Sequence, residues 1–298
     1  GVYQRALVAD GNPATAGGVF VCDGGNPDLD VAVGERVAVT GDAVEFFGET
    51  QIASTSVELL GTADLPTPAL ITLPSAAVRV SNFGEFYPDL EAFEGMLVEF
   101  AGPLVVTDLF NLDRFGEIHL VAGGRPQQFT NINAPDAVAL DAFLRDLGSR
   151  SIMLDDGQTV QNPDPIRYPP PGLPNTTGAI VRSGDTVTGL VGNIRYSRGS
   201  GGSGEELYRL MPTGEPAFSP DNPRPEVPAV AGELQVAALN ALNFFTTLDE
   251  PGSSCGPSAI GCRGADNALE FERQLAKLLL AVAAIDADVI GLIELENN

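Results

Sequence analysis

The sequence predicts a mainly β N-terminal part, made of two small barrel-like domains, followed by the opening of a layered α/β domain. Short apolar runs separated by Gly, Asp and Pro fill residues 1–211. One pattern of these runs occurs twice. After a proline-rich stretch the order of patterns changes to strand, helix, strand, which is typical of α/β domains.

Residues 1–211 have the alternating or continuous apolar runs of short strands. Examples are "GGVFVCDG", "GERVAVTGDAVEFFG", "GMLVEFAGPLVVTD", "RSIMLDDG" and "GDTVTGLVGNIRYS". One helix is expected over residues 136–147, because apolar side chains recur there with helical spacing. The region is therefore predicted to be β-structure with one short helix.

An internal repeat divides this β region. Five residues recur at identical spacing 150 positions later: Gly34, Glu35, Val37, Val44 and Phe46 match Gly184, Asp185, Val187, Ile194 and Tyr196. Each copy follows an apolar run that ends in Asp-Gly, at residues 19–24 and 152–157. We expect two related domains, 1–72 (incomplete at its N-terminal side) and 73–211. Short strands with Gly-marked bends favour Greek-key barrels that resemble the OB-fold.

Residues 212–231 are predicted to be an extended linker, because proline recurs and no apolar period survives. Residues 232–298 then begin with a buried strand from Val236 to Leu239. A helix is expected from Ala268 to Ala284, with Asn267 and Glu270 as a capping box, and a second strand over residues 288–295. Two strands and one helix are too few to bury both faces of such a sheet.

The chain is strongly acidic. It has 40 Asp and Glu against 16 Lys and Arg, a formal net charge of −24, and Lys277 is its only lysine. Two interpretations remain open: adaptation to high salt, where screening removes self-repulsion, or a GC-rich genome that favours arginine codons. Neither fits electrostatic DNA binding, which needs clustered basic residues.

The sequence contains no apolar run near the roughly 20 residues that span a membrane, so no membrane span is predicted. No signal peptide is visible and the sequence begins with Gly1, so we expect a processed or truncated N-terminus. Nothing in the sequence indicates an oligomeric state.

Two of the three cysteines bracket a polar loop. Cys255 and Cys262 are expected to form a local disulfide, which implies an oxidising compartment. Zinc is less favoured, because no second Cys or His pair lies nearby. Cys22 is expected within a strand.

Asn240 and Glu294 end the two strands of the last segment. Adjacent parallel strands bring their C-terminal ends to one sheet edge, where ligands of open α/β sheets bind. A carboxylate and an amide oxygen suit a hard cation such as Mg²⁺. The alternative is that Asn240 bonds turn amides and Glu294 caps a loop.

Longer motifs extend this interpretation. The segments "LQVAALNALNFFTTLD", "RGADNA", "FERQLAK" and "ADVIGLIELENN" resemble the start of the endonuclease/exonuclease/phosphatase superfamily. They resemble most closely the large extracellular bacterial nucleases with a DNase I-like catalytic domain. The upstream β region also resembles the N-terminal part of those nucleases.

The resemblance implies a secreted phosphodiesterase that uses Mg²⁺ or Mn²⁺, with Ca²⁺ as an alternative, on DNA or RNA. Asn240 would help to hold the metal and the scissile phosphate, as a catalytic and metal-binding residue, and Glu294 would bind the metal. The family's catalytic His and Asp lie on later strands. We therefore expect a C-terminally truncated fragment that is inactive alone.

Other functions remain open from the sequence. A phosphatase or lipid phosphodiesterase of the same superfamily is one, and a non-catalytic acidic binding or spacer module is another. Such a module would stack bases on exposed aromatic side chains, with Phe46, Phe47, Phe83, Phe86 and Tyr87 as candidates.

Further residues have two interpretations each. Arg263 either contacts phosphate or, as we favour, forms a structural salt bridge with Asp266 or the loop. The acidic loops at Asp23, 28–30 and 155–156 could hold Ca²⁺, but aspartate in turns explains them better. His119, the single histidine, is expected to be a structural or surface residue.

Overall fold

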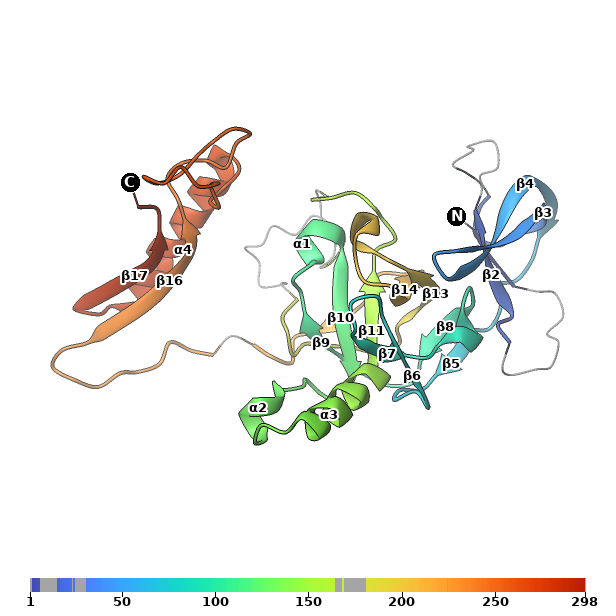
Figure 1. Ribbon diagram of the computed structural model, residues 1–298, viewed down its shortest axis with the longest axis horizontal. Coiled ribbons are helices and arrows are strands. Elements are labelled where there is room, and N and C mark those ends of the chain that lie inside the picture. Colours follow the sequence, from blue (N-terminus) through green and yellow to red (C-terminus); the bar gives the residue numbers. More distant parts are fainter. Residues whose placement is uncertain are drawn as a thin grey trace. The chain divides into compact units, whose positions relative to one another are not determined.

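The computed structural model divides the chain into two units, Gly1–Pro223 and Arg224–Asn298 (Figure 1). It describes residues 2–5 (backbone only), 15–22, 24, 31–163, 168, 181–223 and 225–297. The division between the units falls within the predicted linker. Strand is the main secondary structure of the first unit, as the sequence predicts.

The first unit begins with a four-stranded sheet of order β1-β2-β4-β3. Its strands are β1 (Val2–Arg5), β2 (Gly18–Cys22), β3 (Glu35–Phe46) and β4 (Glu49–Thr62). The long hairpin β3–β4 closes through Phe47 and Gly48, which both have positive φ, of 52° and 85°. Two such residues form the turn whose twist matches that of the flanking strands.

A nine-stranded sheet of order β15-β12-β9-β10-β11-β14-β13-β8-β5 forms the rest of the unit's framework. Its strands are β5 (Ala69–Ile71), β8 (Leu97–Phe100), β9 (Leu104–Asp108), β10 (Glu117–Ala122), β11 (Ser151–Asp155), β12 (Thr186–Val187), β13 (Val191–Ser197), β14 (Leu207–Pro212) and β15 (Phe218–Ser219). The strand pair β6 (Val78–Val80) and β7 (Phe86–Pro88) and the 3₁₀ turns η2 (Glu91–Phe93) and η3 (Ser200–Gly202) complete it.

Three α-helices belong to the first unit: α1 (Leu112–Phe115), α2 (Phe129–Ile132) and α3 (Ala137–Ser149). Figure 1 shows α1 at one end of β10 and α3 at the other. The Asp136 side chain caps α3 by accepting hydrogen bonds from the amides of Val138 and Ala139. The predicted helix over residues 136–147 is confirmed.

The core of this unit is apolar with one buried ionic group. Leu120, Leu154 and Leu210 have 0% exposure and face one another across the central strands. Arg209 precedes Leu210 on β14 and is buried on the opposite face of the sheet; its guanidinium lies 3.3 Å from a carboxylate oxygen of Glu117 and 3.3 Å from one of Asp155. Paired charges of this kind are the form in which a buried arginine is tolerated.

The strand order β1-β2-β4-β3 recurs inside the larger sheet as β10-β11-β14-β13. In both sets the first pair is antiparallel, the second parallel and the third antiparallel. The predicted repeat therefore corresponds to a shared strand order and direction.

The turn before each repeated strand is also shared. Gly34 and Gly184 have φ of 90° and 102°, a conformation that favours glycine. The acidic residue that follows each glycine accepts a hydrogen bond from the amide three residues before it, at 2.7 Å in both turns: Ala32 N to Glu35 Oε2 and Arg182 N to Asp185 Oδ2.

Two predicted boundaries differ from the strand pairing. β5 lies before the boundary predicted at 72/73, yet it pairs with β8 of the larger sheet. β15 lies inside the predicted linker 212–231, yet it pairs with β12. Both strands are three residues or shorter, so neither has enough residues to show a strand period in sequence.

The second unit consists of the parallel strands β16 (Val236–Phe244) and β17 (Val289–Leu295) and the helix α4 (Ala268–Ile285). Asn267 caps α4 by accepting from the Glu270 amide, as predicted, while the Glu270 carboxylate accepts from the Asp266 amide at 3.0 Å. Cys255 and Cys262 form the predicted disulfide, with an S–S distance of 2.06 Å. In the described part of the chain, no helix is both long and apolar enough to cross a membrane.

Candidate metal site

The parallel strands β16 and β17 bring Asn240 and Glu294 together. Asn240 is in register with Ile293, the residue before Glu294. The Asn240 Nδ2 donates a hydrogen bond of 2.7 Å to Glu294 Oε1. Glu294 is the next-to-last residue of β17, whereas Asn240 lies in the middle of β16, at the last pair before the register shift. The juxtaposition expected from the sequence is present, although Asn240 does not end its strand.

The backbone around this pair is unusual. Leu242, Asn243 and Glu294 have φ of 52°, 58° and 62°, the left-handed region that residues other than glycine rarely adopt. The β16–β17 register also shifts between Asn240 and Phe244. Strained non-glycine residues gather at functional sites more often than elsewhere, so this cluster favours a functional interpretation of the pair.

Hydrogen bonds from the pair itself hold this backbone. Asn240 Oδ1 accepts from the Leu242 amide at 2.8 Å, and Glu294 Oε2 accepts from the Asn243 amide at 3.3 Å. Gln274 of α4 donates through Nε2 to the Leu242 carbonyl at 3.2 Å. The Asn240 amide group thus orients the Glu294 carboxylate. Asn240 also accepts a hydrogen bond from a turn amide, that of Leu242, as the alternative interpretation expects.

Glu296 fixes the loop after β16, a contact that the sequence motif did not reveal. One carboxylate oxygen accepts from Thr246 N at 2.8 Å, Thr246 Oγ1 at 2.7 Å and Thr247 N at 3.0 Å. These hydrogen bonds, from Thr247 and Thr246, lower the Glu296 pKa to about 2. Glu296 therefore stays ionised and joins the end of β17 to the segment after β16.

The disulfide loop packs beside the same segment. The space in front of the Gly264 backbone is filled by Phe245, and Phe245 clusters with Cys255 and Cys262. Arg263 is exposed. The salt bridge expected from Arg263 to Asp266 or the loop is absent among the described residues: both side chains are exposed, and Arg263 forms no ion pair within residues 225–297.

The donor chemistry of the pair fits a hard divalent cation. Glu294 is exposed and each of its oxygens keeps a lone pair beyond the hydrogen bonds it accepts. Mg²⁺ is commonly held by one or two carboxylates together with water and substrate phosphate. Among the described residues, no three His, Cys, Asp or Glu side chains converge as a metal cluster; the Asn240–Glu294 pair offers one carboxylate and one amide.

The acidic loops behave as turns where they are described. Asp155 Oδ1 and Asp156 Oδ1 each accept from the amide two residues ahead, both at 2.8 Å. Asp155 also pairs with Arg209. Burial nevertheless raises the Asp155 pKa to about 6, against the opposing effect of Arg209. The other acidic loop, with Asp23 and residues 28–30, lies outside the described residues.

The aromatic candidates separate into exposed and buried groups. Phe46 and Phe47 are each 54% exposed and Phe83 is 63% exposed, while Phe86 is half-buried. Tyr87 is buried, which is a correction to its proposed stacking role: its ring packs against Tyr208, and its hydroxyl lies 3.2 Å from that of Tyr196. Cys22 is a half-buried free thiol at the end of β2.

His119 lies on β10 in the first unit, on the same face as Glu117 and half-buried. Its side chain lines a cavity together with Glu117. The prediction of a structural or surface histidine did not include this cavity.

Comparison of the chain with models of protein families, with curated proteins and with solved structures found no match.

Proposed function

We propose that this chain belongs to a secreted, divalent-metal-dependent nuclease that hydrolyses phosphodiester bonds of extracellular DNA, with RNA as an alternative substrate. The observation that carries the proposal is the hydrogen bond of 2.7 Å from Asn240 Nδ2 to Glu294 Oε1, where the regular pairing of two parallel strands ends. The positive φ angles beside both residues support it. The disulfide fits an oxidising, extracellular compartment.

Within this proposal, Glu294 holds Mg²⁺ or Mn²⁺ and Asn240 keeps its carboxylate in place. When bound, the metal supplies Lewis-acid polarisation of a phosphoryl oxygen. Asn240 is held by its own contact with the Leu242 amide, so it presents its Nδ2 in one orientation. Arg263 is exposed and forms no ion pair within the described second unit. It is the one cation of residues 249–270, whose other charged residues are acidic.

Hydrolysis needs a general base or acid as well as a metal. Residues 224–298 contain no histidine, and the single histidine of the sequence, His119, belongs to the other unit. We therefore expect this chain to bind the metal without measurable cleavage of DNA.

The finer fold assignments are part of the same proposal. Recurrence of the antiparallel, parallel, antiparallel strand set supports two related OB-like domains. The strand–helix–strand order with parallel β16 and β17 supports an endonuclease/exonuclease/phosphatase domain in the second unit.

Metal binding can be tested on the chain itself with Mn²⁺, whose paramagnetism broadens nearby NMR signals. We expect the Asn240 side-chain amide and the backbone amides of residues 293–295 to broaden first. Glu294→Gln keeps the size of the side chain but removes its charge, and should weaken this effect about tenfold or more. Glu272→Gln, an exposed control on α4, should leave it unchanged.

Two results would contradict the proposed site. One is equal broadening in the Glu294→Gln variant. The other is broadening that begins at other acidic residues while the signals of residues 240 and 293–295 stay sharp.

A non-catalytic binding role has one specific observation in its favour. Phe46 and Phe47 form an edge-to-face pair at the tip of the β3–β4 hairpin, with ring centroids 4.7 Å apart, and the Arg198 guanidinium lies 4.3 Å from the Phe47 centroid. Exposed aromatic rings beside an arginine can stack bases of single strands. Binding of a single-stranded oligonucleotide that is lost in Phe46→Ala would favour this alternative; no binding by either protein would remove it.

A further inference from the structure

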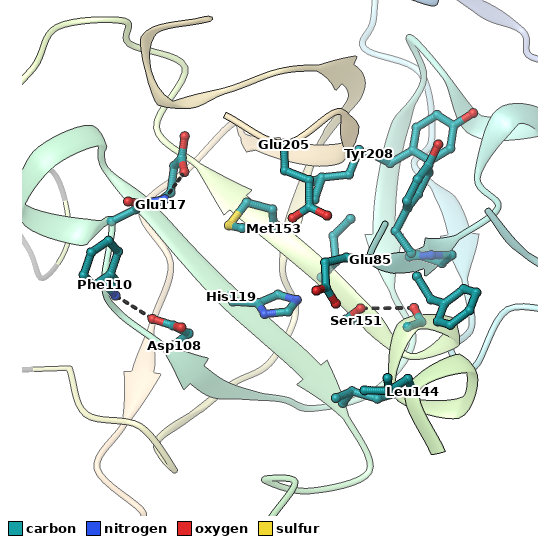
Figure 2. A pocket seen from close by; sticks show the side chains of 18 residues that line it. Glu85, Asp108, Phe110, Glu117, His119, Leu144, Ser151, Met153, Glu205 and Tyr208 are labelled. Atoms are coloured by element: carbon teal, nitrogen blue, oxygen red, sulfur yellow. Dashed lines mark hydrogen bonds between the residues drawn. The ribbon is translucent and has the colours of Figure 1, made fainter. Parts of the chain in front are cut away.

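A cavity of about 350 Å³ lies in the first unit. One wall is formed by β10 and β11, through His119, Ser151 and Met153, and the opposite wall by Tyr87 of β7 and Leu144 of α3. The cavity borders the apolar core through Tyr87, Ile152, Leu207 and Tyr208, while Ile118 and Leu120 of β10 point to the other face of the sheet. Figure 2 shows Glu85, Glu205 and His119 extending into the same space from different elements.

The residues that line this cavity include four acidic side chains, and His119 is the one basic side chain among them. The 18 lining residues include Glu85, Asp108, Glu117 and Glu205, and neither Arg nor Lys. Glu117 is already neutralised by Arg209 and also accepts from Asn111 Nδ2 at 3.0 Å.

The other three carboxylates keep free acceptor capacity. Asp108 accepts from the Phe110 amide through Oδ1 at 2.6 Å, and Glu205 accepts from the Ser81 hydroxyl through Oε1. Their second oxygens, and both oxygens of Glu85, make no hydrogen bond or ion pair with the described residues. Glu85 and Asp108 are exposed and Glu205 is half-buried, so these three carboxylates stand at the cavity with acceptor oxygens open to a ligand.

His119 provides an independent indication of a ligand. It is the register partner of Asp108 on β9 and of Met153 on β11. Burial lowers the pKa of its imidazole, against the opposing effect of Asp108, so the ring is neutral at pH 7 and offers one lone pair. The ring nitrogens make no hydrogen bond within the described residues, and the half-buried ring lines the cavity, so a ligand there can reach them.

We propose that this cavity binds a small organic cation with an alkylammonium or guanidinium head. The free carboxylates and the imidazole lone pair accept N–H donors from such a head. The Phe86 and Tyr208 rings of the lining each have an arginine over them, Arg145 at 4.4 Å and Arg79 at 5.9 Å from the ring centroid, so they offer their remaining edges to its methylene groups. An anionic ligand such as a nucleotide would bring its phosphates against Glu85, Asp108 and Glu205. This site is independent of the proposed metal site in the second unit.

The cation has two sources, a free amine or the Lys or Arg side chain of another protein. The test therefore uses 1,5-diaminopentane and agmatine as free amines, and a capped lysine peptide as the side-chain form. 1,5-Pentanediol and glutarate have matched length without positive charge and serve as ligand controls.

The single histidine makes the test specific to the cavity. An acidic protein attracts amines over its whole surface, but only a ligand in the cavity shifts the one set of imidazole NMR signals, which belongs to His119. At about 150 mM salt, where long-range surface attraction is screened, we expect the amines to shift these signals in a saturable way and the diol and glutarate to leave them in place. A shift by the capped peptide assigns the side-chain source, and its absence assigns the free amine.

Charge-removing variants complete the experiment. The double variant Glu85→Gln and Asp108→Asn keeps side-chain size, and asparagine can still accept from the Phe110 amide, so folding should be preserved. We expect its amine affinity to fall about tenfold or more. Asp113→Asn, an exposed control outside the cavity, should bind as the unmodified protein does. The proposal is overturned if no amine shifts the imidazole signals, if the diol or Mg²⁺ shifts them equally, or if the double variant binds unchanged.

Discussion

The two units of this chain have similar elements but differ in what those elements bury. In the first, the central strands place Leu120, Leu154 and Leu210 at 0% exposure. In the second, α4 has no buried residue, and Leu280 and Ile293 remain 73% and 55% exposed. The helical and strand periods are equally clear in both sequences. The difference shows that a period specifies an element, while burial depends on how many layers pack around it.

Polar contacts therefore have a larger share in holding the second unit together. Its buried residues are few and lie around the disulfide, at Phe245, Cys255, Cys262 and Ala265. The Glu296 contacts, the Asn267 cap and the ring stacking of Phe244 on Phe271, at 5.5 Å between centroids, connect the rest. The proposed metal site thus lies in the unit with the smaller core, where local opening is easier.

The largest effect is expected at Arg209. Arg209→Met should destabilise the first unit by about 3–5 kcal/mol, because Glu117 and Asp155 would remain buried without their cation. Denaturant unfolding followed by a probe in the first unit measures this. The matched control is Arg145→Met, which removes an exposed pair with Asp141 and a guanidinium contact with the Phe86 ring and should cost about 1 kcal/mol or less. Equal effects of the two substitutions would contradict the buried-pair interpretation.

A leucine pair compares the two units directly. Leu120→Ala should cost about 3 kcal/mol, since it opens a cavity in a fully buried site. Leu280→Ala should cost less than about 1 kcal/mol, because that side chain is already in water. Thermal or denaturant unfolding of each variant gives both numbers. If Leu280→Ala proves as costly as Leu120→Ala, the face of α4 is covered in solution and the comparison between the units fails.

A smaller effect depends on pH. Glu94 is buried beside the first sheet, where its Oε1 accepts from the Thr50 amide at 2.8 Å. Burial raises its pKa to about 7. A carboxyl with a raised folded-state pKa stabilises the fold fully below its unfolded value of 4.5, and this contribution is lost as pH rises through about 7.

We therefore expect the first unit to lose about 1–2 kcal/mol between pH 5 and pH 8 through this group, after allowance for solvent screening. Glu94→Gln, which mimics the protonated form, should remove that part of the pH dependence. Glu58→Gln, at an exposed position on β4, should retain it. Unfolding measured at several pH values decides between them, and a Glu94→Gln profile identical to that of the unmodified protein would refute the assignment.

Local patterns predicted the local features of this fold. Residues 137–147 and 268–284 are helical, Cys255 and Cys262 are bonded, and Asn240 meets Glu294 because the apolar runs before them form neighbouring parallel strands. Other contacts between segments far apart in the chain were not predicted from the sequence. The parallel pairing of β11 with β14, the burial of Arg209 between Glu117 and Asp155, and the cavity around His119 each combine segments separated by 30 or more residues. No period within one segment encodes such contacts.

Hydrogen exchange across the whole chain tests the difference between the units most directly. We predict that the amides of β10, β11 and β14 exchange only on global unfolding of the first unit, and that those of β16, β17 and α4 exchange at least about a hundredfold faster. Equal protection of both sets would contradict the account, because the exposed faces of α4 and β17 would then have to be buried in solution.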